Sequence, residues 1–220
     1  MHSIKSSTPA WIDITVPLQN DLVHYPGDNP FNIRRIRETN RGDVCTLSEI
    51  NLTSHSGTHI DAPLHYLTQG QSIDQMPLDI SVSAARVIAI QDPKLIRVTE
   101  LETLDLRHPA SVLFKTQNSA QDWTRRSFMK DYVALSPEAA VFLVRLGIRA
   151  VGIDYLSIGH PDYDEDEVHR ILLRGGVWVI EALNLANIEP GEYEMVCLPL
   201  NIQGADGSPA RVILRPALKN

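Results

Sequence analysis

The sequence is poor in cysteine. It contains two cysteines among 220 residues, Cys45 and Cys197, which lie far apart and belong to no CxxC pair. Disulfide-rich secreted domains and closed structural zinc sites are usually built from many cysteines, so both classes are disfavoured. Both cysteines have apolar neighbours in the sequence, which predicts two buried thiols in a reducing compartment.

The sequence also lacks long apolar runs and an excess of positive charge. No apolar run approaches the roughly 18 residues of a membrane-spanning helix. Residues 1–9 are polar, without the apolar centre of a secretory signal, and we expect a flexible tail there. The chain has 20 Lys and Arg against 27 Asp and Glu, a formal net charge of −7. Because nucleic acids and anionic membranes are bound by basic patches, neither is an expected partner. These features predict a cytoplasmic protein.

What is present is typical of one globular domain. Hydrophobic residues make up 43% of the chain and charged residues 21%, and the length allows a sizeable single core. We find no internal repeat, low-complexity run or interdomain linker, so residues 1–220 are predicted to form one domain.

Hydrophobic patterning and turn signals predict several early strands followed by strand–helix alternation. Helices are expected at 136–146, where Ser136 is a helix cap and Pro137 the first helical residue, and at 164–174, which ends before Gly175-Gly176. The segment 98–106 is expected to be a helix or a loop, and 117–132 a surface excursion. Strands are expected at 11–16, 31–38, 45–53, 86–91, 111–116, 150–154, 177–183, 193–200 and 212–214. This order is typical of a mixed α/β fold whose sheet is flanked by helices.

The most distinctive segment is 54–65, which contains three of the eight histidines. Gly57 and Pro63 argue against a helix there, so we expect a strand that runs into an ordered loop, with alternate side chains on one face. Imidazole and carboxylate together suit Zn²⁺, Mn²⁺ or Fe²⁺. The alternative is a polar cluster with a purely structural role. The four ligand-type side chains that share a face are His55, His59, Asp61 and His65.

The run from His55 to His65, HSGTHIDAPLH, resembles the HxGTHxDxPxH signature of the metal-dependent cyclase family, which includes bacterial kynurenine formamidases and isatin hydrolases. The resemblance extends from about Asp13 to Leu214. It implies a mixed domain of the swivelling β/β/α type. It further implies hydrolysis of a small amide, formamide or cyclic amide, N-formylkynurenine by default, and a homodimer or larger homo-oligomer.

Two further residues are candidate ligands. Glu181 lies in an otherwise apolar predicted strand, where a carboxylate is costly unless it is paired or bound to a cation. His169 lies on the predicted helix before it, and the family has the same His and Glu spaced twelve residues apart. Two alternatives remain: Glu181 pairs with an arginine such as Arg170 or Arg174, or His160 replaces His169.

Together with the hydrolysis that the resemblance implies, these residues predict the parts of a metal-dependent site. One or two divalent ions, Zn²⁺ first and Mn²⁺ second, are expected on His55, His59, Asp61, His169 and Glu181. Asp61 and Glu181 are the expected bridging ligands, because a carboxylate has two oxygens. His65 is the expected general base and acid, since imidazole titrates near neutral pH; its alternative role is that of one more ligand.

The segment beginning at Tyr25 and ending at Asp28 matches an aromatic-Pro-Gly-Asp segment that lies near the substrate in the formamidases. In them the aromatic residue is typically Trp, so Tyr25 is a candidate substrate contact that departs from the family pattern. This departure keeps an isatin-like lactam or a lactone as an alternative substrate. A non-catalytic metal- or ligand-binding module is the alternative from another functional class.

Overall fold

The main sheet closes on itself. The computed structural model describes residues 10–106 and 110–217, so the predicted tail at 1–9 lies outside the described residues. The strand order is β1-β12-β11-β5-β7-β9-β10-β4, and β4 also pairs with β12. The strands are β1 (Ile12–Asp13), β4 (His59–Asp61), β5 (Val82–Ala89), β7 (Ser111–Lys115), β9 (Ala150–Ile153), β10 (Trp178–Glu181), β11 (Gly191–Pro199) and β12 (Gly207–Pro216). The short strand β4 therefore closes the ring, and it carries two of the predicted ligands.

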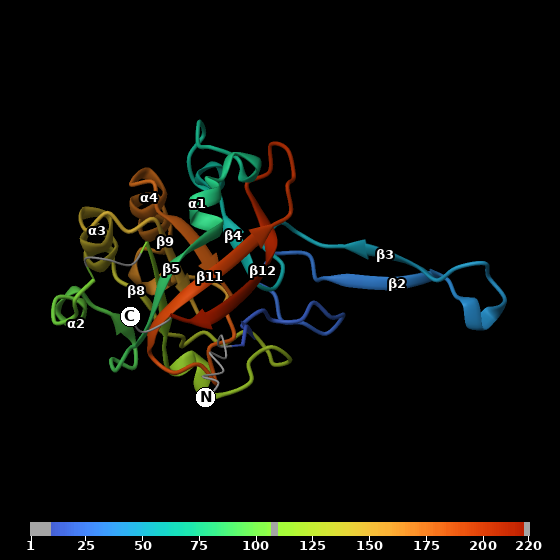
Figure 1. The fold of residues 1–220 in the computed structure, drawn as a ribbon, viewed down its shortest axis with the longest axis horizontal. Helices are drawn as coiled ribbons and strands as arrows, with labels where there is room; N and C mark the ends of the chain where they lie inside the picture. Colours follow the sequence, from blue (N-terminus) through green and yellow to red (C-terminus); the bar gives the residue numbers. More distant parts are fainter. Residues whose placement is uncertain (1–9, 107–109, 218–220) are drawn as a thin grey trace, which may run out of the picture.

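Helices cover the outer face of the parallel part of this ring. The β5–β7, β7–β9 and β9–β10 pairs are parallel, as expected for strands joined by crossover connections. The helices are α1 (Leu78–Ser81), α2 (Val98–Leu101), α3 (Pro137–Arg145) and α4 (Glu165–Arg174). Figure 1 shows α2, α3 and α4 together on one side of the body. No helix within the described residues is long and apolar enough to cross a membrane.

Side chains alternate between two apolar cores. Inside the ring, Leu113 and Ile180 pack with residues of β11 and β12. On the outer face, Val112 and Val179 pack under α3 and α4. This alternation places every second residue of β10 beneath the helices, and Glu181 is on the same face as Val179. The position of Glu181 under α4 thus follows from strand geometry.

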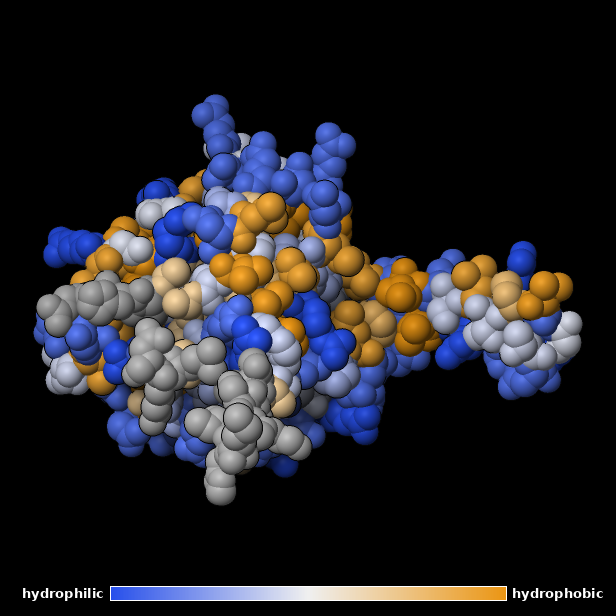
Figure 2. All heavy atoms as spheres, in the orientation of Figure 1, coloured by the Kyte–Doolittle hydropathy of each residue, from blue (hydrophilic) through white to orange (hydrophobic). Residues whose placement is uncertain are grey.

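A two-stranded ribbon projects from the body. It consists of β2 (Asn32–Arg37) and β3 (Leu47–Asn51), which pair with each other and not with the main sheet. Its exposed apolar side chains are Ile36, Val44, Leu47 and Ile50. Figure 2 shows apolar atoms along the ribbon and where it joins the body. The prediction that Cys45 is buried is wrong: Cys45 is exposed, because it lies on this ribbon, away from both cores. Cys197 is buried, as predicted.

The predicted mixed α/β fold with helices flanking a sheet is confirmed. Several predicted strands differ in bounds or length from those observed, and two of them show why. Only Ile12–Asp13 of segment 11–16 is a strand, with an added bridge from Thr15 to Leu183, and the expected strand at 212–214 is part of the longer β12. A small pair, β6 (Leu95–Ile96) with β8 (Ala134–Leu135), was not predicted, since two-residue strands leave no period to detect.

Candidate metal centre

The cluster begins with two neighbouring strands. His59 on β4 lies directly opposite Glu181 on β10, and Asp61 lies opposite Val179. Because Val179 packs under the helices, all three polar side chains face the same way. His59, Asp61 and Glu181 are each at most 4% exposed. The closed sheet therefore brings two carboxylates and an imidazole together in a buried position.

His55 and His65 come from the turns on either side of β4. As predicted, a strand runs into an ordered loop in this segment, because β4 is followed by the 3₁₀ turn Pro63–His65. The strand does not reach back to His55, since Gly57 has φ of +62°. A left-handed φ suits glycine, and proline suits the first position of a helical turn. The same two residues that argued against a helix thus lie on either side of the strand, Gly57 before it and Pro63 after it, and the turns direct both imidazoles to the cluster.

The buried face of α4 supplies His169. Its Nδ1–H donates to the carbonyl oxygen of Glu165 at 2.8 Å, so its Nε2 is left 3.2 Å from Glu181 Oε1 and 3.8 Å from Asp61 Oδ2. His59 is held likewise, with Nδ1–H donating to the Gly57 carbonyl at 2.8 Å. A histidine fixed at one nitrogen by a backbone carbonyl presents the other as a metal ligand.

Asp61 is shared by two groups of potential ligands. One consists of His55, His59 and Asp61, the other of Asp61, His169 and Glu181; within each group the ligand atoms lie within 4.8 Å of one another. Asp61 Oδ1 lies 2.8 Å from His55 Nδ1, whereas Oδ2 is the oxygen nearer His169. Glu181 likewise directs Oε2 to His59 and Oε1 to His169. The two carboxylates thus each face both halves of the cluster.

Three buried atoms of this cluster make no hydrogen bond within the described part of the chain. They are His59 Nε2, Asp61 Oδ1 and Asp61 Oδ2. Asp61 Oδ1 lies within 3.4 Å of two imidazole nitrogens, but without the geometry of a hydrogen bond. A buried carboxylate with no hydrogen bond costs several kcal/mol. The donor set and its unsatisfied atoms therefore fit a divalent cation.

The charges of the cluster favour protons or a cation on the imidazoles. Burial lowers the pKa of His55, but Asp61 and Asp206 outweigh it and raise the pKa to about 10. Burial is likewise outweighed at His59 and His169, whose carboxylate neighbours raise each pKa to about 9. Protons and a metal ion therefore compete for the same nitrogens, and metal binding releases protons.

Asp206, just before β12, is a site residue that the sequence analysis missed. Its Oδ2 lies 2.8 Å from His55 Nε2 and 3.4 Å from His65 Nδ1, and its Oδ1 accepts a hydrogen bond from Ser54 Oγ. Hydrogen bonding to the two histidines holds the pKa of Asp206 well below its usual range. The following residue is Gly207, where a Cβ atom would lie 2.9 Å from His55 Cε1. The only sequence signal was a glycine after an acid ahead of the last strand, which reads as an ordinary turn.

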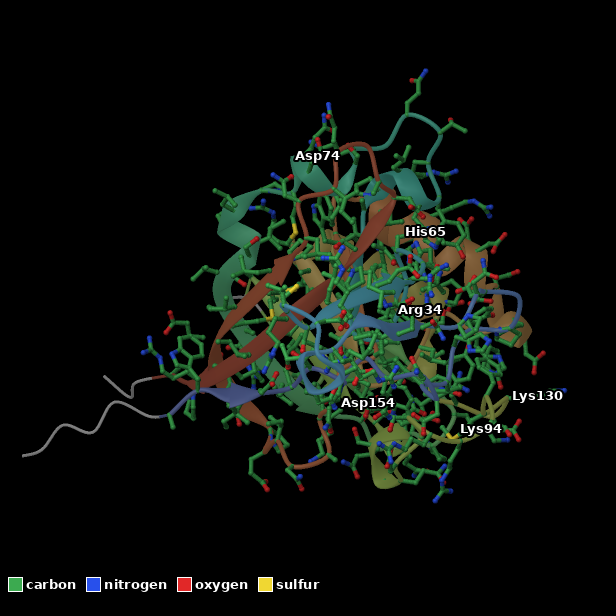
Figure 3. The ribbon with its side chains drawn as sticks, turned by 90° about the vertical axis from the view of Figure 1, so that its right-hand side faces the viewer. Arg34, His65, Asp74, Lys94, Lys130 and Asp154 are labelled. Atoms are coloured by element: carbon green, nitrogen blue, oxygen red, sulfur yellow. The ribbon has the colours of Figure 1, made fainter. Side chains whose placement is uncertain are left out.

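His65 lies at the opening of the cluster. Its side chain is 29% exposed, against 1% for His59, and its ring centroid is 4.0 Å from that of His55. Figure 3 marks His65 in a view from the side that carries the ribbon. An imidazole that borders both the cluster and the solvent can exchange protons with either.

A cavity of about 180 Å³ opens over the cluster. Tyr25 forms part of its wall, and the Tyr25 hydroxyl donates a hydrogen bond to Glu165 Oε2 at 2.7 Å. The Tyr25 ring meets Phe128 edge-on at 5.3 Å, so the excursion at 117–132 packs against a residue of the cavity wall. The lining residues are Tyr25, Asp28, His55, His65, Tyr66, Leu156, Ser157, Glu165, His169 and Glu181.

The structure distinguishes between the two alternatives left open for Glu181 and His169. Glu181 is held by His59, His169 and the N–H of Ile158, whereas Arg170 pairs with Asp166. An ion pair between Glu181 and Arg170 is therefore wrong. His160 uses both ring nitrogens elsewhere, with Nε2–H donating to the Lys130 carbonyl and Nδ1 accepting from the Asp162 N–H. Its geometry favours His169 as the histidine of the cluster.

Comparison with known proteins gives a consistent picture. The family model described as "Putative cyclase" matches residues 12–160. Kynurenine formamidase from Geobacillus thermodenitrificans is 36% identical over 207 residues, covering 93% of this chain and 97% of that protein. Kynurenine formamidase from Bacillus cereus is 32% identical over 209 residues, covering 95% and 99%.

Solved structures share the fold. One described as a potential metal-dependent hydrolase with cyclase activity superposes with a TM-score of 0.82 at 31% identity, covering 96% of this chain and 99% of that chain. Isatin hydrolase A from Labrenzia aggregata superposes with a TM-score of 0.80 at 23% identity, covering 95% and 94%. At that identity the second likeness concerns the fold alone.

Proposed function

The chain belongs to the cyclase family of metal-dependent amidohydrolases, and we propose that it hydrolyses the C–N bond of a small aryl formamide, with N-formylkynurenine as the leading substrate. The observation that carries this proposal is the buried cluster beneath a small cavity, with His65 at its opening. The kynurenine formamidases that it resembles over most of its length support the formamide.

A second candidate substrate is an isatin-like lactam. Tyr25 occupies the position at which the formamidase segment typically has Trp, and the fold is shared with an isatin hydrolase. Both substrates are hydrolysed at an amide carbonyl by the same chemistry, so the difference lies in how the cavity holds the rest of the molecule.

We propose Zn²⁺ as the ion and Mn²⁺ as the alternative, since imidazole and carboxylate ligands suit both. His55, His59, Asp61, His169 and Glu181 would hold one or two ions, and Asp61 and Glu181 would be able to serve both halves of the cluster because each faces both. When bound, such an ion supplies Lewis-acid activation of a water and of the substrate carbonyl.

The chain's own residues manage the protons. We propose that His65 takes a proton from the attacking water and then donates it to the departing nitrogen, so that the C–N bond breaks and formate and a free amine leave. Asp206 orients His65 through Nδ1, which leaves Nε2 for proton transfer. Tyr25 contacts the substrate from the cavity wall.

Removal of the metal tests the proposal directly. We expect a strong chelator to abolish hydrolysis of N-formylkynurenine, and added Zn²⁺ or Mn²⁺ to restore it, because three buried cluster atoms make no hydrogen bond in the described chain. Metal content is measured by elemental analysis alongside the hydrolysis rate. Full activity in a preparation shown to be free of metal would refute the mechanism.

We further propose a cytoplasmic homodimer in which residues 1–220 form one domain. The closed sheet that joins early and late strands supports the single domain. The projecting ribbon supports the dimer, because a two-stranded ribbon with exposed apolar side chains is poorly stable by itself and is stabilised by packing against a second copy.

Charging the ribbon is expected to give a monomer. Ile36 and Ile50 are 45% and 54% exposed, so the double variant Ile36→Asp/Ile50→Asp removes apolar contact area without disturbing either core. Light scattering at micromolar concentration should give a dimer mass for the wild type and a monomer mass for the variant. Leu78→Asp, at an exposed position on α1 of the body, is the matched control and should remain a dimer. A monomeric wild type would contradict the dimer, and a dimeric double variant would exclude the ribbon as the contact.

A further inference from the structure

We propose that Glu165, assisted by Asp28, recognises a positively charged group of the substrate, a primary ammonium, at the mouth of the cavity. The inference rests on the proposed formamide hydrolysis. It adds that the substrate carries an ammonium group besides the formamide. Glu165 was not a candidate in the sequence, where it is one of several acids at the start of a helix.

Glu165 is fixed in place by neutral donors. Its Oε2 accepts from the Tyr25 hydroxyl at 2.7 Å and its Oε1 accepts from Ser157 Oγ at 2.8 Å. In the part of the chain that the structure describes, no lysine or arginine forms an ion pair with it. Because a carboxylate oxygen can accept more than one hydrogen bond, both oxygens can still receive an N–H. The carboxylate is thus ordered, and within the described residues it makes no ion pair, although Arg170 lies nearby over the Tyr66 ring.

Surrounding residues hold Glu165 close to the cluster. Gly159 packs so tightly on it that a Cβ atom there would lie 2.8 Å from Glu165 Cα. Burial and the neighbouring Glu165 carboxylate raise the pKa of Tyr25, so its hydroxyl remains a donor at neutral pH. Glu165 also lies four residues before His169, one turn along the same face of α4. Both side chains line the same cavity, so a charged substituent of a bound aryl formamide can reach Glu165.

The charge of the cavity wall points to a cation. Among the described residues that line it there is no lysine or arginine, whereas Asp28, Glu165 and Glu181 each contribute a carboxylate. A divalent ion in the cluster would neutralise Glu181 and Asp61 at the floor. Asp28 and Glu165 remain at the mouth, and two carboxylates favour a cationic group beside them. An isatin-like lactam has no such cation, so the wall favours the formamide.

The test compares two aryl formamides that differ in one group. One carries an aminoethyl substituent, which is an ammonium at neutral pH, and the other a hydroxyethyl substituent at the same ring position. We expect the metal-loaded wild type to favour the ammonium compound at least tenfold in kcat/KM. Glu165→Gln keeps the shape and the acceptor for Tyr25, and should reduce this preference about tenfold, mainly through KM.

Two further variants sharpen the test. Glu167→Gln removes the same charge from an exposed position on the same helix and should leave both rates and the preference unchanged. Asp28 lies in a partly exposed loop, and Asp28→Asn should also reduce the preference for the ammonium compound. This variant keeps the test open if Glu165→Gln folds poorly. Metal content and thermal melting show whether each variant folds.

The outcomes separate the inference from the proposed function. If the metal-loaded wild type hydrolyses neither compound, the formamidase activity is wrong and the inference falls with it. If the wild type hydrolyses both without preference, or if Glu165→Gln and Asp28→Asn slow both compounds equally, the activity stands and the recognition of an ammonium is overturned.

Discussion

Replacing His65 with alanine is expected to lower kcat by about 10²- to 10⁴-fold, the usual contribution of a general acid–base, while the purified protein keeps its metal. His65 is the most exposed of the three histidines in the HxGTHxDxPxH segment, and its Nδ1 faces Asp206 rather than Asp61 or Glu181. Its loss therefore removes proton transfer and leaves the buried ligands in place.

The matched variant is His59→Ala. His59 is 1% exposed and its Nε2 has no hydrogen bond in the described chain, so we expect it to lose both metal and activity. Elemental analysis and single-turnover rates of the two variants, purified side by side, distinguish a proton carrier from a ligand. His55, His65 and Asp206 also lie close enough to hold an ion. If His65→Ala emptied the site, His65 would be a ligand of that group and another base would have to be sought.

The sequence predicted the chemistry of the cluster better than its geometry. Glu181 stood out because a carboxylate in an apolar strand needs a partner. The structure places it directly opposite His59 on the neighbouring strand, although the two residues are 122 positions apart in the sequence. The predicted strand that runs into a loop is present, but it covers only His59–Asp61, because alternation alone cannot show where Gly57 and Pro63 turn the chain. Both turns were nevertheless compatible with a shared site.

Residues whose importance depends on pairing between distant strands could not be found. Asp206 reaches His55 and His65 only because β12 pairs with β4 and places Gly207 opposite Asp61. Cys45 and the ribbon illustrate the same limit: β-strand periodicity predicts strands, but it does not say whether they join the main sheet. Long-range pairing, and not local propensity, decided these cases.

Replacing Glu181 with glutamine is expected to remove most of the stabilisation that metal gives the protein. The amide keeps the size of the side chain and an oxygen for the Ile158 N–H, but it loses the charge that faces His59 and His169. A ligand that binds only the native state adds RT ln(1 + [L]/Kd), about 2.7 kcal/mol at 100 times Kd. If the variant binds metal about 100-fold more weakly, the same concentration adds only about 0.4 kcal/mol.

Thermal melts of wild type and Glu181→Gln, each with and without Zn²⁺, measure this difference. We expect a large metal-induced rise in Tm for the wild type and a rise close to zero for the variant. Glu167→Gln, an exposed charge change on α4, controls for general electrostatics and should retain the wild-type rise. If the role of Glu181 were purely structural, its replacement would destabilise the metal-free and metal-loaded proteins equally. The metal-induced rise in Tm would then be unchanged in the variant. That result would remove Glu181 from the metal centre and leave a mononuclear site on His55, His59 and Asp61.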